Sequence, residues 1–139
     1  MRIRPLTEAD KLTIAAMIAR DPEHSAKGMR PEFFFADNGT LSICCEDDHG
    51  PVFFMRLDPS PPESIRIHIQ FDEDLGMAIR TAKTLIDSFD QVTAKCRRMP
   101  SCKRIVFESM SESLRRFFCR DRFGFRPVAG TADLELWLK

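Results

Sequence analysis

The sequence contains no tyrosine, although it has twelve phenylalanines and one tryptophan. Any mechanism that needs a phenol as an acid is therefore excluded. No apolar run approaches the roughly 20 residues of a membrane-spanning helix, and no signal peptide is recognisable, so we expect a cytoplasmic protein without a membrane partner. The formal net charge is zero, which does not indicate a generally basic protein for nucleic acid.

The five cysteines also lack the patterns that give cysteine a structural role. Their number is odd, and the neighbours Cys44 and Cys45 cannot easily bridge each other. None has CxxC spacing, and the three histidines do not cluster with them. We therefore expect reduced thiols and no zinc or other metal site.

The length and composition predict one domain that spans residues 1–139. The chain is 43% hydrophobic and 30% charged, which is typical of a folded, soluble domain. The charge is unevenly spread, because residues 46–74 carry eight acids against two bases and residues 95–126 carry ten bases against three acids. Such segments are usually solvated faces, but they can also orient a charged ligand.

Alternating apolar residues predict strands, and a 3.6-residue period predicts helices. The predicted strands are residues 2–6, 40–46, 52–57, 64–71, 103–109, 125–128 and 132–138. The predicted helices are residues 8–20, about 75–95, and a third that follows Ser111 or Ser113 and ends at Gly124. Residues 58–62 are interpreted as a stiff connection, and residues 24–35 as a loop on the substrate side. The expected inward residues are Leu12, Ala15, Ala16 and Ala19 on the first helix, and Leu75, Ala78, Ile79, Ala82, Leu85, Ile86, Phe89 and Val92 on the second.

The turn between the 64–71 strand and the long helix is the most informative stretch. Unpaired amides and the dipole at a helix start favour an anion. This turn, however, contains one glycine, Gly76, and three acids, Asp72, Glu73 and Asp74. It has the position of an anion site and the wrong charge for one.

The order of these elements resembles that of the GCN5-related N-acetyltransferase (GNAT) family. The opening Met1–Asp10 and the closing Phe123-Gly124-Phe125 are similar to the family's first and last motifs. The resemblance spans the whole chain and implies an α/β (α+β) fold. The expected architecture is a mixed, mostly antiparallel central sheet of six or seven strands, flanked by three or four helices.

The resemblance also implies acetyl-coenzyme A as cofactor, with its pyrophosphate on the turn. Gly76 and Ala78 occupy the last two places of the family's phosphate motif, but Glu73 stands where Arg or Gln is expected. A carboxylate about 5 Å from a phosphate charge costs on the order of 3 kcal/mol at an effective dielectric constant near 20. The residues implied in cofactor binding are Ile69, Phe71, Asp74, Leu75, Gly76, Met77, Ala78, Arg80, Lys83 and Ser111.

The family places a tyrosine near Cys119 or Arg120 as the acid that protonates the leaving thiolate. Cys119 can in principle serve as that acid, whereas a buried structural thiol is the alternative. For the general base, His68 is the first candidate and Glu108 the second. The alternatives are a packed histidine and a carboxylate that pairs with an arginine.

Two classes of function follow. The first is transfer of an acetyl group by direct attack of a primary amine, on a small-molecule or peptide acceptor that Asp37, Asp47, Asp48 and Asp58 would attract. The second is a GNAT-like fold without this activity that acts as a binding or structural module, with a phage or prophage origin as one option. The acidic turn and the missing tyrosine favour it. Nucleic acid on the arginine-rich 113–122 helix is not expected, because its phenylalanines follow core spacing. A homodimer through an edge strand is a further expectation.

Overall fold

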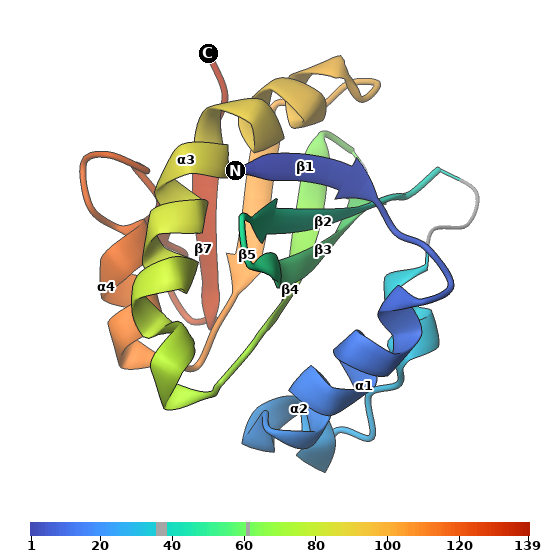
Figure 1. The fold of residues 1–139 in the computed structure, drawn as a ribbon. Helices are drawn as coiled ribbons and strands as arrows, with labels where there is room; N and C mark the ends of the chain where they lie inside the picture. The colour runs from blue at the N-terminus through green and yellow to red at the C-terminus, as the bar shows by residue number, and fades with distance from the viewer. Residues whose placement is uncertain (36–38, 61) are drawn as a thin grey trace. The chain divides into compact units, whose positions relative to one another are not determined.

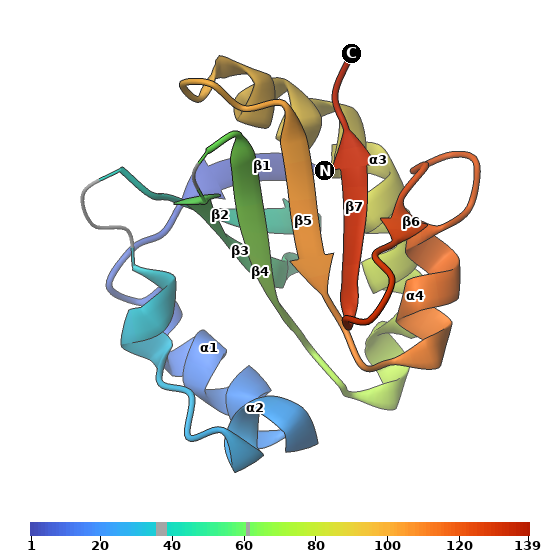
Figure 2. The ribbon, with the colours of Figure 1, turned by 180° about the vertical axis from the view of Figure 1, so that it is seen from behind.

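The computed structural model describes residues 1–35, 39–60 and 62–139. Over this part of the chain, seven strands form one open, mostly antiparallel sheet in the order β1-β2-β3-β4-β5-β7-β6. The strands are β1 (Arg2–Pro5), β2 (Leu41–Asp47), β3 (Gly50–Ser60), β4 (Ser64–Phe71), β5 (Arg104–Glu108), β6 (Arg126–Pro127) and β7 (Asp133–Trp137). The helices are α1 (Asp10–Ala19), α2 (Pro22–Ala26), α3 (Ala78–Arg98) and α4 (Glu112–Phe118), with 3-10 turns η1 (Pro31–Phe34) and η2 (Leu75–Met77). The predicted fold class and element order are confirmed (Figures 1 and 2).

Two compact units make up this structure. Unit 1 contains Met1–Arg56 and Ile69–Asp90, and unit 2 contains Leu57–His68 and Gln91–Lys139. No helix among the described residues has both the length and the apolar composition needed to cross a membrane.

In unit 1, β1 pairs antiparallel with β2, with Ile3 opposite Cys45. Helices α1 and α2 lie side by side in both views (Figures 1 and 2), and η1 packs on α1. The core between these helices and the strands is built from large apolar side chains that are almost fully buried, namely Ile14, Met17, Ile18, Phe34, Cys44 and Phe54. Phe34 belongs to this core, and Phe33 and Phe35 on either side of it pack against the core while they stay partly exposed.

The predicted inward face of α1 is wrong. Leu12 is 82% exposed, and Ala15, Ala16 and Ala19 are also exposed. The buried side of α1 instead begins at Asp10, whose carboxylate accepts two hydrogen bonds from Arg4, at 2.8 and 2.9 Å. This ion pair with β1 turns a charged residue inward, and the apolar residues one and two turns later follow it into the core.

The predicted apolar stripe of the long helix is only partly correct. Leu85 and Val92 are buried, but Leu75 is 97% exposed and Ile79 is 83% exposed. Small polar side chains, Thr84, Ser88 and Thr93, and the thiol of Cys96 take the buried positions instead. The Ser88 hydroxyl donates to the carbonyl of Leu85 at 3.3 Å, which shows how such a residue is satisfied within the helix itself.

In unit 2, β4 runs parallel to β5, and β7 pairs antiparallel with both β5 and β6 (Figure 2). Ser111 caps α4, because its hydroxyl accepts from the amide of Leu114 at 3.3 Å. Five rings pack against one another in tilted or T-shaped pairs with centroids 5.0–5.9 Å apart, namely Phe107, Phe117, Phe118, Phe123 and Phe125. These rings occupy core positions, as their spacing predicts.

Two sequence interpretations need correction or lie beyond the structure. Asp58, Pro59 and Ser60 continue β3 instead of forming a stiff connection. Pro61, in the same segment, and Asp37, a predicted attractor of the amine, lie outside the described residues.

Candidate functional site

The turn that follows β4 already binds anionic oxygens of its own chain. The amide of Asp74 donates to the Asp72 carboxylate, and the amide of Gly76 donates to the Asp74 carboxylate, both at 3.0 Å. The amide of Met77 donates to the carbonyl of Asp74 at 2.9 Å. Asp74 is the N-cap of the 3-10 turn η2. The donors expected to hold a phosphate are present, and carboxylates occupy two of them.

The charge at this turn is negative. Arg20 holds Asp72 with two hydrogen bonds of 2.9 Å, which neutralises one acid. Glu73 forms no ion pair with another described residue. Burial raises the pKa of Glu73, and the nearby charges of Asp21 and Asp72 raise it further. An approaching anion would meet this uncompensated carboxylate.

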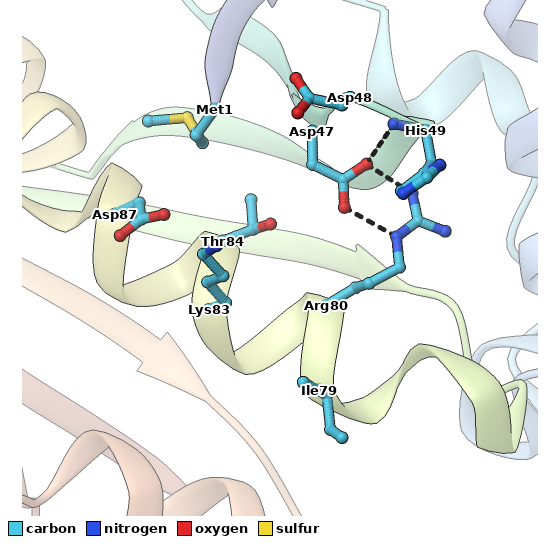
Figure 3. Close-up of a pocket in the computed structure, with 9 residues that line it drawn as sticks. All are labelled: Met1, Asp47, Asp48, His49, Ile79, Arg80, Lys83, Thr84 and Asp87. Carbon is cyan, nitrogen blue, oxygen red and sulfur yellow. Dashed lines mark hydrogen bonds and ion pairs between the residues drawn. The ribbon is translucent and has the colours of Figure 1, made fainter.

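Arg80 and Lys83 line a pocket of about 290 Å³ between the β2–β3 hairpin and the first turns of α3 (Figure 3). Arg80 makes two hydrogen bonds of 2.7 Å to Asp47, and this contact holds the pKa of Asp47 far below its usual range. The lining also includes Asp48 and Asp87, so its charge is mixed. Since Arg80 is paired with Asp47, its charge does not offset that of Glu73.

The remaining implied cofactor residues in unit 1 lie on the end of β4 and the start of α3. Ile69 is buried, and the ring of Phe71 lies 5.7 Å from that of Phe53. Leu75 and Ala78 are exposed at the start of the helix. The structure thus brings the turn residues together on one surface.

The two predicted bases belong to unit 2, and each has a charged partner. Nε2 of His68 lies 3.1 Å from Asp58, and the Glu108 carboxylate lies 4.0 Å from Arg66. Arg66 binds Asp133 more closely, at 3.0 and 3.1 Å. The catalytic roles of His68 and Glu108 stay predictions.

Ser111 and Cys119 lie at opposite ends of α4, also in unit 2. The Ser111 hydroxyl is engaged as the helix cap. Cys119 is a free, half-buried thiol at the C-cap. Its role as an acid stays a prediction. Among the described residues there is no group of three or more histidine, cysteine or acidic side chains that could hold a metal.

One polar cluster was missed by sequence reasoning. Nδ1 of His24 lies 2.6 Å from Oε1 of Gln70 and 3.2 Å from Asp21. Gln70 is fully buried on β4, and its amide nitrogen donates to Asp21 at 3.2 Å. The Asp21-Pro22 start of α2 could have signalled that Asp21 and His24 share one helical turn, but nothing local points to Gln70, 46 residues away.

Comparison with known proteins identifies the architecture. No family model and no curated protein matches the chain. Among solved structures, the aminoglycoside acetyltransferase AAC(6')-Ib in complex with paromomycin and acetyl-coenzyme A superposes with a TM-score of 0.67 at 13% identity, over 97% of this chain and 92% of the other. The GNAT domain of S. lividans PAT gives 0.63 at 15% identity, over 99% and 90%.

The chain has the GNAT fold. A spermidine N-acetyltransferase, a chimera of the Vibrio cholerae SpeG and hSSAT sequences, has the same fold with a TM-score of 0.63, over 99% of this chain and 96% of the other. Its identity is 12%. At such identities the comparison carries the GNAT fold, and the chemistry must be argued from this chain's own residues.

Proposed function

We propose that this protein is an N-acetyltransferase that moves the acetyl group of acetyl-coenzyme A to a primary amine of a small cationic acceptor. The observation that carries the proposal is the β4–η2 turn, where backbone amides hold anionic oxygens at the start of a long helix on a GNAT fold. The structural neighbours support the reaction class, because they are named acetyltransferases of aminoglycosides and of spermidine.

The backbone of the turn fits a pyrophosphate. The carboxylate oxygens bound to the amides of Asp74 and Gly76 stand in for phosphate oxygens. Gly76 has an ordinary backbone conformation, and a Cβ there would meet only Oδ1 of Asp74, at 3.5 Å. Space does not demand this glycine, so we interpret it as leaving the amide open to a ligand. The bound cofactor would supply an activated thioester, and the carboxylates must rotate away to admit it.

A cationic acceptor fits the charge of unit 1. Burial raises the pKa of Glu73 on the turn, and the charges of Asp21, which caps α2, and of Glu23 on α2 raise it further, so these acids lie near one another. A polyamine or aminoglycoside would reduce this repulsion on binding. The same acids oppose the cofactor, so cofactor affinity should be modest and should rise in the presence of the acceptor.

Calorimetry with acetyl-coenzyme A, followed by a thiol-release assay with spermidine and kanamycin as acceptors, tests the proposal. We expect binding in the micromolar to millimolar range and thiol release that depends on the amine. Product mass should increase by one acetyl group per transfer. Failure to bind acetyl-coenzyme A at millimolar concentration would exclude the enzyme.

A second candidate is a binding module that has no acyl donor. The internal carboxylates of Asp72 and Asp74 favour it, because they complete the turn without a ligand. Glu73, which has no ion pair with another described residue, favours it as well. In that case spermidine binds, acetyl-coenzyme A does not, and removal of the Glu73 charge leaves acetyl-coenzyme A unbound.

A further inference from the structure

The ring of His24 is held from one side only. Its Nδ1 contacts Gln70 at 2.6 Å and Asp21 at 3.2 Å, whereas Nε2 makes no hydrogen bond with another described residue. The side chain is 18% exposed, so it is largely enclosed but still reaches solvent. Such a ring has one defined hydrogen-bonded nitrogen and one available nitrogen.

The partners of Nδ1 fix where the proton lies. The Gln70 amide nitrogen donates to the Asp21 carboxylate at 3.2 Å and to the Phe71 carbonyl at 2.9 Å, which leaves the Gln70 Oε1 atom as an acceptor. Nδ1 of His24 must therefore carry the proton that this oxygen accepts. In the neutral ring, Nε2 then holds the lone pair.

The supporting residues are rigid. Gln70 is fully buried and Asp21 is 7% exposed. The other oxygen of Asp21 accepts from the amides of Glu23 and His24, both at 3.1 Å, so the carboxylate is fixed as the cap of α2. A histidine oriented in this way by a buried carboxylate and amide is prepared to take a proton at Nε2.

We propose that His24 is the general base that deprotonates the acceptor amine, with Gln70 and Asp21 as positioning residues. The inference rests on the proposed acetyl transfer. Nε2 takes one proton from the ammonium group; the amine nitrogen then forms the new C–N bond as the C–S bond of the thioester breaks. The second proton of the nitrogen leaves with the thiolate, which gives the amide and the free thiol, and His24 returns its proton to solvent.

The tautomer of His24 can be tested without measuring acetyl transfer. In the ligand-free protein, long-range ¹H–¹⁵N correlation spectra assigned with His24→Gln should show Nδ1 protonated and Nε2 unprotonated in neutral His24. Gln70→Ala should move the proton toward Nε2. A neutral His24 protonated at Nε2 in the unaltered protein overturns the inference, whether or not the protein transfers acetyl groups.

Kinetics with acetyl-coenzyme A and spermidine test the role itself. His24→Gln should lower kcat/KM by about 100-fold or more with little change in KM, which is the usual contribution of a general base. His24→Ala should recover part of its rate on addition of imidazole. The control Glu8→Gln, at an exposed carboxylate on the α1 side, should keep the original rate. An unchanged rate in His24→Gln, or a loss only in His68→Gln, contradicts the inference while the proposed function stands.

The pH profile separates catalysis from support of the fold. Asp21 lies 3.2 Å from the His24 ring, and Glu73 interacts electrostatically with His24 as well as with Asp21, Glu23 and Asp72, so the charged groups around this ring are mainly acidic. The rate should fall with acidification as Nε2 becomes protonated, and this acid limb should be absent from the residual activity of His24→Gln. If His24→Gln retains the acid limb, another residue is the general base. If the unaltered protein binds acetyl-coenzyme A but transfers to neither amine, the proposed transfer fails, and the role of His24 in it fails too.

Discussion

Glu73 is the side chain that most opposes an anionic ligand on the turn after β4. Its neighbours on the turn have partners, since Asp72 binds Arg20 and Asp74 caps the Gly76 amide. Glu73 has no ion pair with any described residue, and its pKa is raised. A raised pKa on a carboxyl group means that the folded protein disfavours its charge, so the turn is most receptive to an anion when Glu73 is neutral.

Glu73→Gln should therefore strengthen binding of acetyl-coenzyme A. The expected change in Kd is about tenfold, between the few-fold effect of this charge at the dielectric constant of water and the roughly hundredfold effect at an effective dielectric constant near 20. Calorimetry at two salt concentrations measures it, and the gain should shrink at high salt. Glu8→Gln removes the same charge from an exposed position on the α1 side and should leave Kd unchanged. Equal gains in both variants would mean that net charge alone controls binding.

The five thiols should differ sharply in reactivity. Burial raises the pKa of Cys44 and of Cys96 to about 12, and Cys45 is equally buried. Cys119 and Cys102 are only half-buried, although burial also raises the pKa of Cys102. Since the thiolate is the nucleophile, iodoacetamide at pH 8 should label Cys119 first and Cys102 second.

Peptide mass spectrometry measures the order of labelling, and the other three thiols should react only after denaturation. Early labelling of Cys44 would contradict the packing of β2.

At the scale of elements, α1 is oriented by charge as much as by apolar residues. Arg4 on β1 donates to Asp10 at the start of α1 and to Glu46 on β2 at 3.0 Å. Its side chain is 21% exposed and that of Asp10 is 5% exposed. One guanidinium thus joins three elements of unit 1, and the exposed face of Leu12 is a consequence.

Asp10→Asn should destabilise the fold. The substitution leaves the half-buried guanidinium of Arg4 without one of its two carboxylates, and breaking a buried ion pair from one side costs on the order of 3 kcal/mol. Urea denaturation followed by circular dichroism should show a lower midpoint at an unchanged slope. Glu8→Gln, two residues earlier and mostly exposed, should change the free energy of unfolding by less than about 0.5 kcal/mol. A stable Asp10→Asn protein would mean that apolar packing alone positions α1.

At the scale of the whole molecule, the sequence predicted what is local. The alternation of Ile65, Ile67 and Ile69 identified β4, and a serine before the last helix identified the start of α4. Every such signal depends on neighbours within a few residues. The order of elements then led to the GNAT fold.

The site was less predictable because its contacts join distant segments. Arg80 pairs with Asp47, 33 residues away, and His24 reaches Gln70, 46 residues away. A single sequence gives no sign of such pairings, so Arg80 looked free to bind phosphate and His24 looked like part of a loop. The prediction of the inward face of α1 was wrong for the same reason, because the partner of Asp10 lies on another element.

Both units should lose stability in acid, because both are held by carboxylates that accept from arginines. Hydrogen bonds from Arg4 lower the pKa of Asp10, those from Arg80 lower that of Asp47, and those from Arg66 lower that of Asp133. A carboxylate whose pKa is lowered in the folded protein contributes its full stabilisation at pH values above its pKa in the unfolded chain, which is near 4. That contribution is lost as the pH falls through the folded value.

Urea denaturation at pH 7, 5, 4 and 3 should give a free energy of unfolding that is nearly constant to about pH 5 and then falls steadily. Asp133→Asn should be less stable at pH 7 and should lose less on acidification, since it has one carboxylate fewer to protonate. Glu73 contributes to stability with the opposite sign, because its pKa is raised in the folded protein. Protonation of Glu73 therefore stabilises the fold. Glu73→Gln should therefore steepen the loss, whereas a profile flat to pH 3 would show that the arginine pairs contribute little to either unit.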